Sequence, residues 1–107
     1  MNMQSTAGPP AGGPTKDEIL AISLHKLGLC RSDTFADLGC GTGRVSFEAS
    51  TQVHSVHAVD RRESACEWTR NEALSKNIKN ITVHQAENST FLSTLDSLDT
   101  AFIGGSQ

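Results

Sequence analysis

The chain has 107 residues, so it holds at most one modest domain and buries a smaller share of its surface than a typical enzyme. Nine Lys and Arg against twelve Asp and Glu give a net charge of −3, and the basic residues are scattered along the sequence. This distribution argues against a protein that grips nucleic acid through its phosphates. No apolar run approaches the roughly 20 residues of a membrane-spanning helix. We therefore expect no nucleic-acid partner and no membrane segment.

The three cysteines are an odd number without a CxxC pair, which argues against both a disulfide framework and a zinc site. The four histidines form no ligand cluster in the sequence, so we predict no metal site. Unpaired thiols, together with an N-terminus unlike a secretory signal, favour a cytoplasmic protein. We interpret Cys40 as a small side chain packed against a helix rather than as a reactive thiol.

The first 14 residues hold three Pro and three Gly and show no apolar period. We predict a flexible lead-in over residues 1–13 and a folded domain over residues 14–107. Thr15 and Glu18 form a capping box before apolar residues at helical spacing, and Gly28 supplies a stop. These signals predict a first helix from Thr15 to Leu27.

A strand is expected over Thr34–Leu38, because this short apolar segment follows a polar turn and leads into a glycine cluster. A second helix is expected from about Arg44, with Val45 and Phe47 directed inward. The segment Val53–Asp60 reads as the second strand and ends in an acid.

Good helix formers over Glu63–Lys76 predict the next helix. Its expected apolar face consists of Ala65, Cys66, Trp68, Ala73 and Leu74, with Trp68 in the core between helix and sheet.

The remaining pattern predicts a strand over Ile81–His84, a helix over Ser89–Leu98 and a strand over Thr100–Ile103. Strands that alternate with helices imply an α/β domain with a parallel sheet and right-handed crossover helices. The last strand ought to lie near the middle of a larger sheet, where an uncovered apolar edge is an aggregation hazard. We therefore expect that a C-terminal half is missing from this sequence, or that a second copy covers the strand.

The motif Asp37-Leu38-Gly39-Cys40-Gly41-Thr42-Gly43 lies between the first strand and the second helix, where open parallel sheets bind their ligands. A dinucleotide fingerprint, GxGxxG, would require glycine at the position of Arg44. The observed DxGxGxG resembles motif I of the Rossmann-like S-adenosylmethionine (SAM) methyltransferases. This resemblance implies that Gly39, Gly41 and Gly43 hold the methionine end of the cofactor and that Asp37 interacts with its amino group.

Asp60 ends the second strand, at about the distance past the glycines where an acid bonds ribose hydroxyls. A carboxylate suits this task because it accepts two hydrogen bonds at once. By the same resemblance Asp60 would hold the ribose 2′ and 3′ hydroxyls, with Arg61 near the adenine. After the third strand, either Glu87 or Asn88 would bond the adenine amino group.

Two flanking segments, Gly13-Pro14-Thr15-Lys16 and Asp99–Ser106, resemble the decarboxylating precorrin-6Y methyltransferases of cobalamin synthesis, and the resemblance covers almost all of the chain from Gly13 onward. It implies that SAM methylates C15 of a precorrin, a tetrapyrrole, and that an acetate side chain loses carbon dioxide. Thr15 would lie at the cofactor and the loop of Gly104, Gly105 and Ser106 on the substrate side of the pocket mouth. The resemblance also implies assembly from several identical subunits, with four as the expected number.

The SAM methyl is already electrophilic, so a methyltransferase aligns donor and acceptor and excludes water, and no catalytic residue is assigned. We expect the residues that control decarboxylation to lie beyond Gln107. Arg44, Arg61 and Arg62 could attract an acidic substrate, but we interpret them as solvated surface charges. The alternatives are a methyltransferase acting on RNA or protein and a SAM-binding module without activity. The glycine spacing disfavours a nucleotide-linked dehydrogenase.

Overall fold

The computed structural model describes residues 20, 23–96 and 98–103. The predicted lead-in and the predicted helix start at Thr15 lie outside these residues. Residues 23–26 are helical, and the chain then turns at Gly28, whose φ of +70° is a conformation that favours glycine. Leu24 is fully buried in one cluster with Phe35 and Val56, so this helical segment packs onto the sheet.

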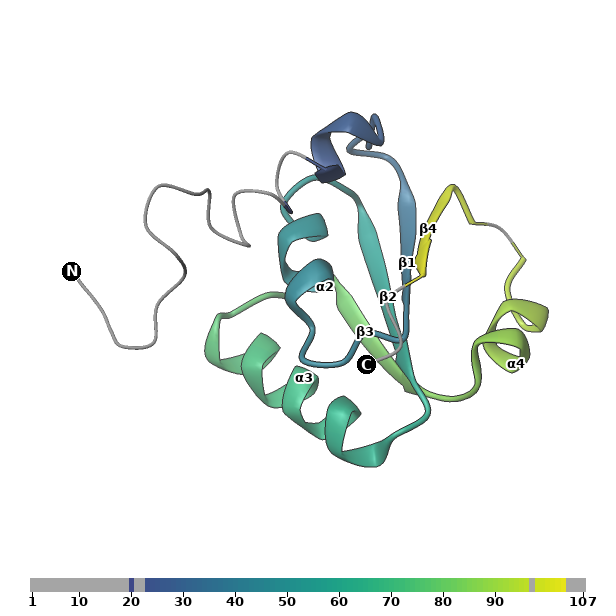
Figure 1. Ribbon diagram of the computed structural model, residues 1–107. Coiled ribbons are helices and arrows are strands. Elements are labelled where there is room, and N and C mark those ends of the chain that lie inside the picture. The colour runs from purple at the N-terminus through teal and green to yellow at the C-terminus, as the bar shows by residue number, and fades with distance from the viewer. Residues whose placement is uncertain (1–19, 21–22, 97, 104–107) are drawn as a thin grey trace, which may run out of the picture.

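Four parallel strands form one sheet in the order β3-β2-β1-β4 (Figure 1). Their bounds are β1 Thr34–Leu38, β2 Ser55–Asp60, β3 Ile81–Gln85 and β4 Thr100–Ile103. The predicted α/β architecture is confirmed, with small differences at strand ends. In this order β1 and β2 occupy the centre, so the two segments that carry the acids Asp37 and Asp60 lie side by side.

Helices cover both faces of the sheet (Figure 1): α2 (Arg44–Ala49) and α3 (Glu63–Ser75) lie on one face and α4 (Asn88–Ser93) on the other. The predicted extension of the last helix to Leu98 is wrong. Ser93 Oγ donates to the Thr90 carbonyl at 2.7 Å, and Thr94 Oγ1 donates to the Phe91 carbonyl at 2.7 Å. These hydroxyls compete for the carbonyls that the next helical turn would use, so the helix ends.

The core divides into two apolar clusters, one on each face of the sheet. Neighbouring residues of β1 belong to different clusters because successive side chains of a strand point to opposite faces. Phe35 lies in the cluster with Leu24 and Val56, and Ala36 lies in the cluster with Val59 and Phe91. The central strand is thus buried on both faces, as a parallel sheet requires.

The predicted inner face of α3 needs correction. Its buried residues are Cys66, Thr69 and Ala73, whereas Trp68 is 54% and Leu74 is 79% exposed. Helical residues are separated by about 100°, so Trp68 points about 200° away from Cys66 around the axis. The expectation that Trp68 belongs to the core is therefore wrong.

The inner residues of α2 also differ from the prediction. Ser46 and Ala49 are buried, while Val45 and Phe47 are half-buried. Val45 still packs against the core, but Phe47 lies against Gly43 and below the Lys76 ammonium, 5.7 Å from its ring centre. The small residues face the sheet: Ser46 donates to Asp37 of β1, and Ala49 packs in the cluster of Phe35.

The edge strand β4 pairs with β1 through its whole length, and its Ile103 side chain is 72% exposed. That further chain or a second copy covers this edge remains a prediction. None of the helices in the described part of the chain has the length and apolar character that crossing a bilayer requires.

A histidine pair bridges β2 and β3 beneath α4. His57 Nδ1 and His84 Nε2 are 2.9 Å apart, and both rings contact the Phe91 ring. One ring must donate and the other accept, so the contact needs at least one neutral imidazole. Burial lowers the pKa of His57, and burial together with the charges of His57 and Arg70 lowers the pKa of His84.

We expect this histidine pair to lower the stability of the fold in mild acid. Both histidines have folded-state pKa values below the ordinary 6.5, so the unfolded chain binds protons first as the pH falls. Their contribution is fully present above pH 6.5 and is lost as the pH falls toward the folded-state values. The melting temperature of the wild type should therefore fall more between pH 7.5 and 5.5 than that of His57→Asn. Parallel melting curves for the two proteins would contradict this prediction.

Candidate functional site

The glycine loop joins β1 to α2 at the carboxyl ends of the two central strands. Gly39 N and Cys40 N both donate to the Val59 carbonyl, at 2.7 and 2.8 Å, which fixes the start of the loop to β2. Gly39 has a φ of +78° and no atom near the place of a Cβ, so glycine is needed there for its backbone angle. The loop therefore begins with an open backbone surface.

The end of the loop is closely packed. Gly43 has a φ of +84°, and a Cβ there would lie 2.8 Å from Phe47 Cζ and 2.9 Å from Thr69 Cγ2. Thr69 of α3 also donates from Oγ1 to the Gly41 carbonyl at 3.2 Å. Any side chain at position 43 would force the side chains of Phe47 on α2 and Thr69 on α3 to shift. The third glycine of the motif thus sets the packing of both helices around the loop.

Asp37 lies on β1 directly before the loop and is almost fully buried. Ser46 Oγ donates to Asp37 Oδ2 at 2.7 Å. Burial raises the Asp37 pKa from 3.8 to about 6, because water no longer solvates the charge, and the Ser46 hydrogen bonds only partly offset this effect. A cationic ligand beside this carboxylate would offset the energetic cost of its lost solvation.

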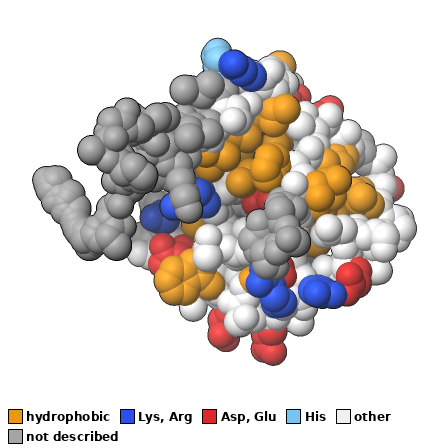
Figure 2. Space-filling model, viewed as in Figure 1, with side chains coloured by type: hydrophobic (Ala, Val, Ile, Leu, Met, Phe, Trp, Pro, Cys, Tyr) orange, Lys and Arg blue, Asp and Glu red, His pale blue; other side chains and the backbone are white. Residues whose placement is uncertain are grey.

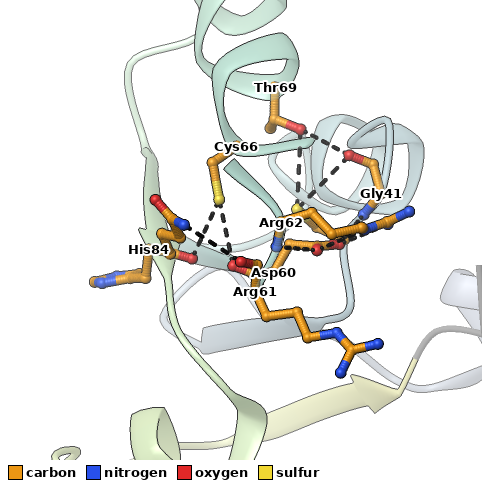
Figure 3. Close-up of polar contacts among 9 residues, drawn as sticks. Gly41, Asp60, Arg61, Arg62, Cys66, Thr69 and His84 are labelled. Atoms are coloured by element: carbon orange, nitrogen blue, oxygen red, sulfur yellow. Dashed lines mark hydrogen bonds and ion pairs between the residues drawn. The ribbon is translucent and has the colours of Figure 1, made fainter. Parts of the chain in front are cut away.

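Asp60 ends β2 next to the loop and accepts four hydrogen bonds (Figure 3). Gly41 N donates to Oδ2 at 3.0 Å and Arg62 N donates to Oδ1 at 2.9 Å. The Arg62 side chain donates from Nε to Oδ1 at 3.0 Å and from Nη2 to Oδ2 at 2.9 Å. Hydrogen bonding to Arg62 is the main reason that the Asp60 pKa lies well below its usual range.

A cavity of about 500 Å³ opens beside the loop. This volume falls in the range of roughly 300 to 1,000 Å³ that small-molecule sites occupy. Asp37 and Arg62 contribute to the wall together with the loop, and the apolar part of the wall comes from Val45, Ala65, Trp68 and Phe102. The cavity thus joins a buried acid, a glycine backbone and an aromatic side, a combination that suits a zwitterionic ligand with a flat ring.

The cysteines near the site are structural. Cys40 is buried, lies 3.8 Å from Thr69 Oγ1, and has a pKa raised to about 12, chiefly by burial. Cys66 donates from Sγ to the Asp60 carbonyl at 3.3 Å and holds α3 to the end of β2. Because a reactive cysteine needs an accessible thiolate, the interpretation of Cys40 as a packing residue is confirmed.

The structure brings together part of the predicted site. Asp37, Gly39 and Gly41 line the cavity, Gly43 packs behind it, and Asp60 bonds the loop. Arg61 extends away from the Asp60 network (Figure 3).

Glu87 and Asn88 begin α4, and neither belongs to the wall of that cavity, so their adenine contact stays a prediction. Thr15, Gly104, Gly105 and Ser106 lie outside the described residues.

Two residues of the cavity wall were given other places by the sequence analysis. Arg62 was interpreted as a solvated charge, but it forms the ion pair with Asp60; the signal was an arginine two residues after the acid that ends a strand. Trp68 was assigned to the core, yet it lies half-exposed at the cavity wall. Among the described residues, no three His, Cys, Asp or Glu side chains gather into a metal site.

The parallel sheet and the glycine loop between two acids define the class of Rossmann-like methyltransferases. The family described as "Methyltransferase domain" matches residues 31–105, and the chain belongs to it.

Among curated proteins, the chain is 44% identical to a probable cobalt-precorrin-6B C(15)-methyltransferase (decarboxylating) of Methanosarcina mazei, over 91% of this chain and 55% of that protein. It is 38% identical to the protein of the same name from Methanococcus vannielii, over 87% of this chain and 51% of the relative. The chain thus spans about half the length of the curated relatives it matches.

Two solved structures are similar. The precorrin-8w decarboxylase of Methanobacterium thermoautotrophicum has a TM-score of 0.78 and 29% identity, with 88% of this chain and 51% of that chain covered. The precorrin-6y C5,15-methyltransferase of Geobacter metallireducens has a TM-score of 0.77 and 30% identity, with 92% and 53% covered. Both carry the fold that the sequence predicts.

Proposed function

We propose that this chain is the cofactor-binding part of a SAM-dependent methyltransferase that methylates C15 of a cobalt-precorrin and decarboxylates it. The observation that carries the proposal is the placement of two acids at the glycine loop beside the cavity. Asp37 lies buried in the cavity wall, and Asp60 is bonded to the glycine loop at Gly41 N. The names of the relatives at 44% and 38% identity support the substrate.

The residues present fit SAM. Asp37 is a desolvated carboxylate, and the ammonium of the methionine end would supply its missing counter-charge. Asp60 would accept the ribose hydroxyls, and Gly39 leaves room for a close backbone approach. The apolar side chains of Trp68 and Phe102 would exclude water from the bound cofactor.

In the reaction, SAM supplies a methyl group on a positively charged sulfur. This chain contributes orientation, because Asp37 and Asp60 fix the two ends of the cofactor relative to the loop. A side-chain nucleophile is not required. The tetrapyrrole would approach from the side of Phe102, which lines the cavity from β4.

The charge distribution supports a small-molecule substrate over RNA. On the face shown in Figure 2, the Lys and Arg side chains of the described residues are dispersed and do not form one basic surface. A nucleic-acid substrate would require such a surface.

The free thiols of Cys30, Cys40 and Cys66 support our placement of the reaction in the cytoplasm.

Calorimetric titration with SAM and with NAD tests the proposal. We expect saturable binding of SAM and none of NAD, because Arg44 stands where the dinucleotide fingerprint needs glycine. Tighter binding of NAD, or binding of neither, would contradict it. Incubation with SAM and cobalt-precorrin-6B should then give a product heavier by one methylene. Loss of carbon dioxide is expected only where the residues that control decarboxylation, which we place beyond Gln107, are also present. SAM binding without this product would identify a binding module.

A further inference from the structure

All acceptor positions of the Asp60 carboxylate are occupied. An ionised carboxylate offers about four lone-pair sites, and four N–H groups occupy them. The main-chain groups Gly41 N and Arg62 N take one site on each oxygen. The Arg62 guanidinium takes the other site on each oxygen, through Nε and Nη2.

The two pairs of bonds have different characters. The main-chain bonds fix Asp60 between the loop and the start of α3, and they do not use the side chain at position 62. The guanidinium bonds depend on a long side chain that is 44% exposed, while the Asp60 side chain is 4% exposed. Arg62 lines the cavity and Asp60 does not. The guanidinium therefore lies between the carboxylate and the space where a ligand would enter.

We propose that Arg62 is an internal competitor for the ribose of the cofactor and thereby sets the affinity of the site. This inference rests on the proposed function, since it takes SAM as the ligand. A ribose presents two hydroxyls, and each needs an acceptor. The guanidinium holds one acceptor site on each Asp60 oxygen, which is the number and arrangement that the two hydroxyls require. SAM binding exchanges two hydrogen bonds from Arg62 for two from the ribose.

The exchange is sterically simple. Arg62 precedes the first residue of α3 with an extended backbone (φ −87°, ψ 125°), so its side chain can swing toward solvent without moving the helix. Its own N–H remains on Oδ1 and Gly41 N remains on Oδ2. Asp60 thus keeps its position when the guanidinium leaves. Until then, Arg62 neutralises a carboxylate that would otherwise be buried unpaired.

Calorimetry on Arg62→Ala tests the proposal, with SAM and with 5′-methylthioadenosine as probes. The second probe keeps the ribose hydroxyls but lacks the amino-acid end, so it isolates the ribose from attraction between Arg62 and the cofactor carboxylate. We expect both probes to bind about three- to tenfold more tightly than to the wild type, since a half-exposed bidentate pair no longer competes. Arg70→Ala is the matched control, because Arg70 lies on α3 outside this cavity and should leave both affinities unchanged.

Arg62→Lys covers the case in which the alanine variant fails to fold. A lysine keeps the charge but cannot bond both oxygens in fork geometry, so binding should be tighter than in the wild type but less so than in Arg62→Ala. Unchanged or weaker binding in the folded variants would overturn the competitor role and leave SAM binding by the wild type standing. Absence of SAM binding in the wild type and in every variant would instead overturn the proposed function, and this inference with it.

Discussion

Asp60→Ala is expected to weaken SAM binding by about 5- to 150-fold, or about 1 to 3 kcal/mol, the range for leaving bonded polar groups without partners. Both ribose hydroxyls would lose their acceptor. Gly41 N and the Arg62 guanidinium would lose theirs as well, so the loop would no longer be fixed to the end of β2. Calorimetric titration with SAM at pH 7.5 measures the change in affinity.

The same substitution should also lower the melting temperature. The folded-state pKa of Asp60 lies below its ordinary value of 3.8, so the carboxylate stabilises the fold at pH values above 3.8, and this contribution is lost as the pH falls through the folded-state value. Asp99→Ala is the matched control: Asp99 Oδ2 also accepts a backbone N–H, from Thr34, but at the opposite end of β1. It should cost stability without changing SAM affinity. Equal SAM affinity in Asp60→Ala and the wild type would refute the ribose role.

Asp37→Asn is expected to weaken SAM binding by about 10- to 150-fold, because the ammonium would lose a charged partner worth roughly 1.5 to 3 kcal/mol. Its fold should be retained, since asparagine keeps an oxygen for the Ser46 hydroxyl. The melting temperature at pH 7.5 should hold or rise, because the folded state no longer contains a desolvated carboxylate. Calorimetry and thermal melting of the same samples give both results.

The pH dependence of SAM affinity tests whether Asp37 contacts the ammonium of the cofactor. Its pKa is about 6 in the folded protein, so below pH 6 it is protonated and must release a proton before it can pair with the ammonium. Wild-type affinity for SAM should therefore decline as the pH falls from 7 to 5.5, and the affinity of Asp37→Asn should decline less. The same slope in both proteins would assign the dependence to another group and remove Asp37 from the cofactor contact.

Much of the fold follows from local patterns. The strand β1 was predicted with its observed bounds, because an apolar segment between a polar turn and a glycine cluster has few alternatives. β4 was likewise predicted over its observed residues. Helix ends were predicted less well: α4 ends at Ser93 because two hydroxyls bond nearby carbonyls, a local competition that the spacing of leucines does not reveal.

The candidate site also has a part that the sequence predicts and a part that only the structure shows. By itself the sequence indicated Asp37, Asp60 and the three glycines, because the glycine motif follows a strand and resembles that of the SAM methyltransferases, and an acid ends the next strand. Their contacts with the cofactor stay a prediction. Only the tertiary structure decided that Arg62 forms an ion pair with Asp60, that Trp68 lies at the cavity wall, and that His57 is hydrogen-bonded to His84. These contacts depend on strand register and on the rotation of α3 about its axis. Both are set by the packing of the whole sheet, so a pattern along one segment cannot specify them.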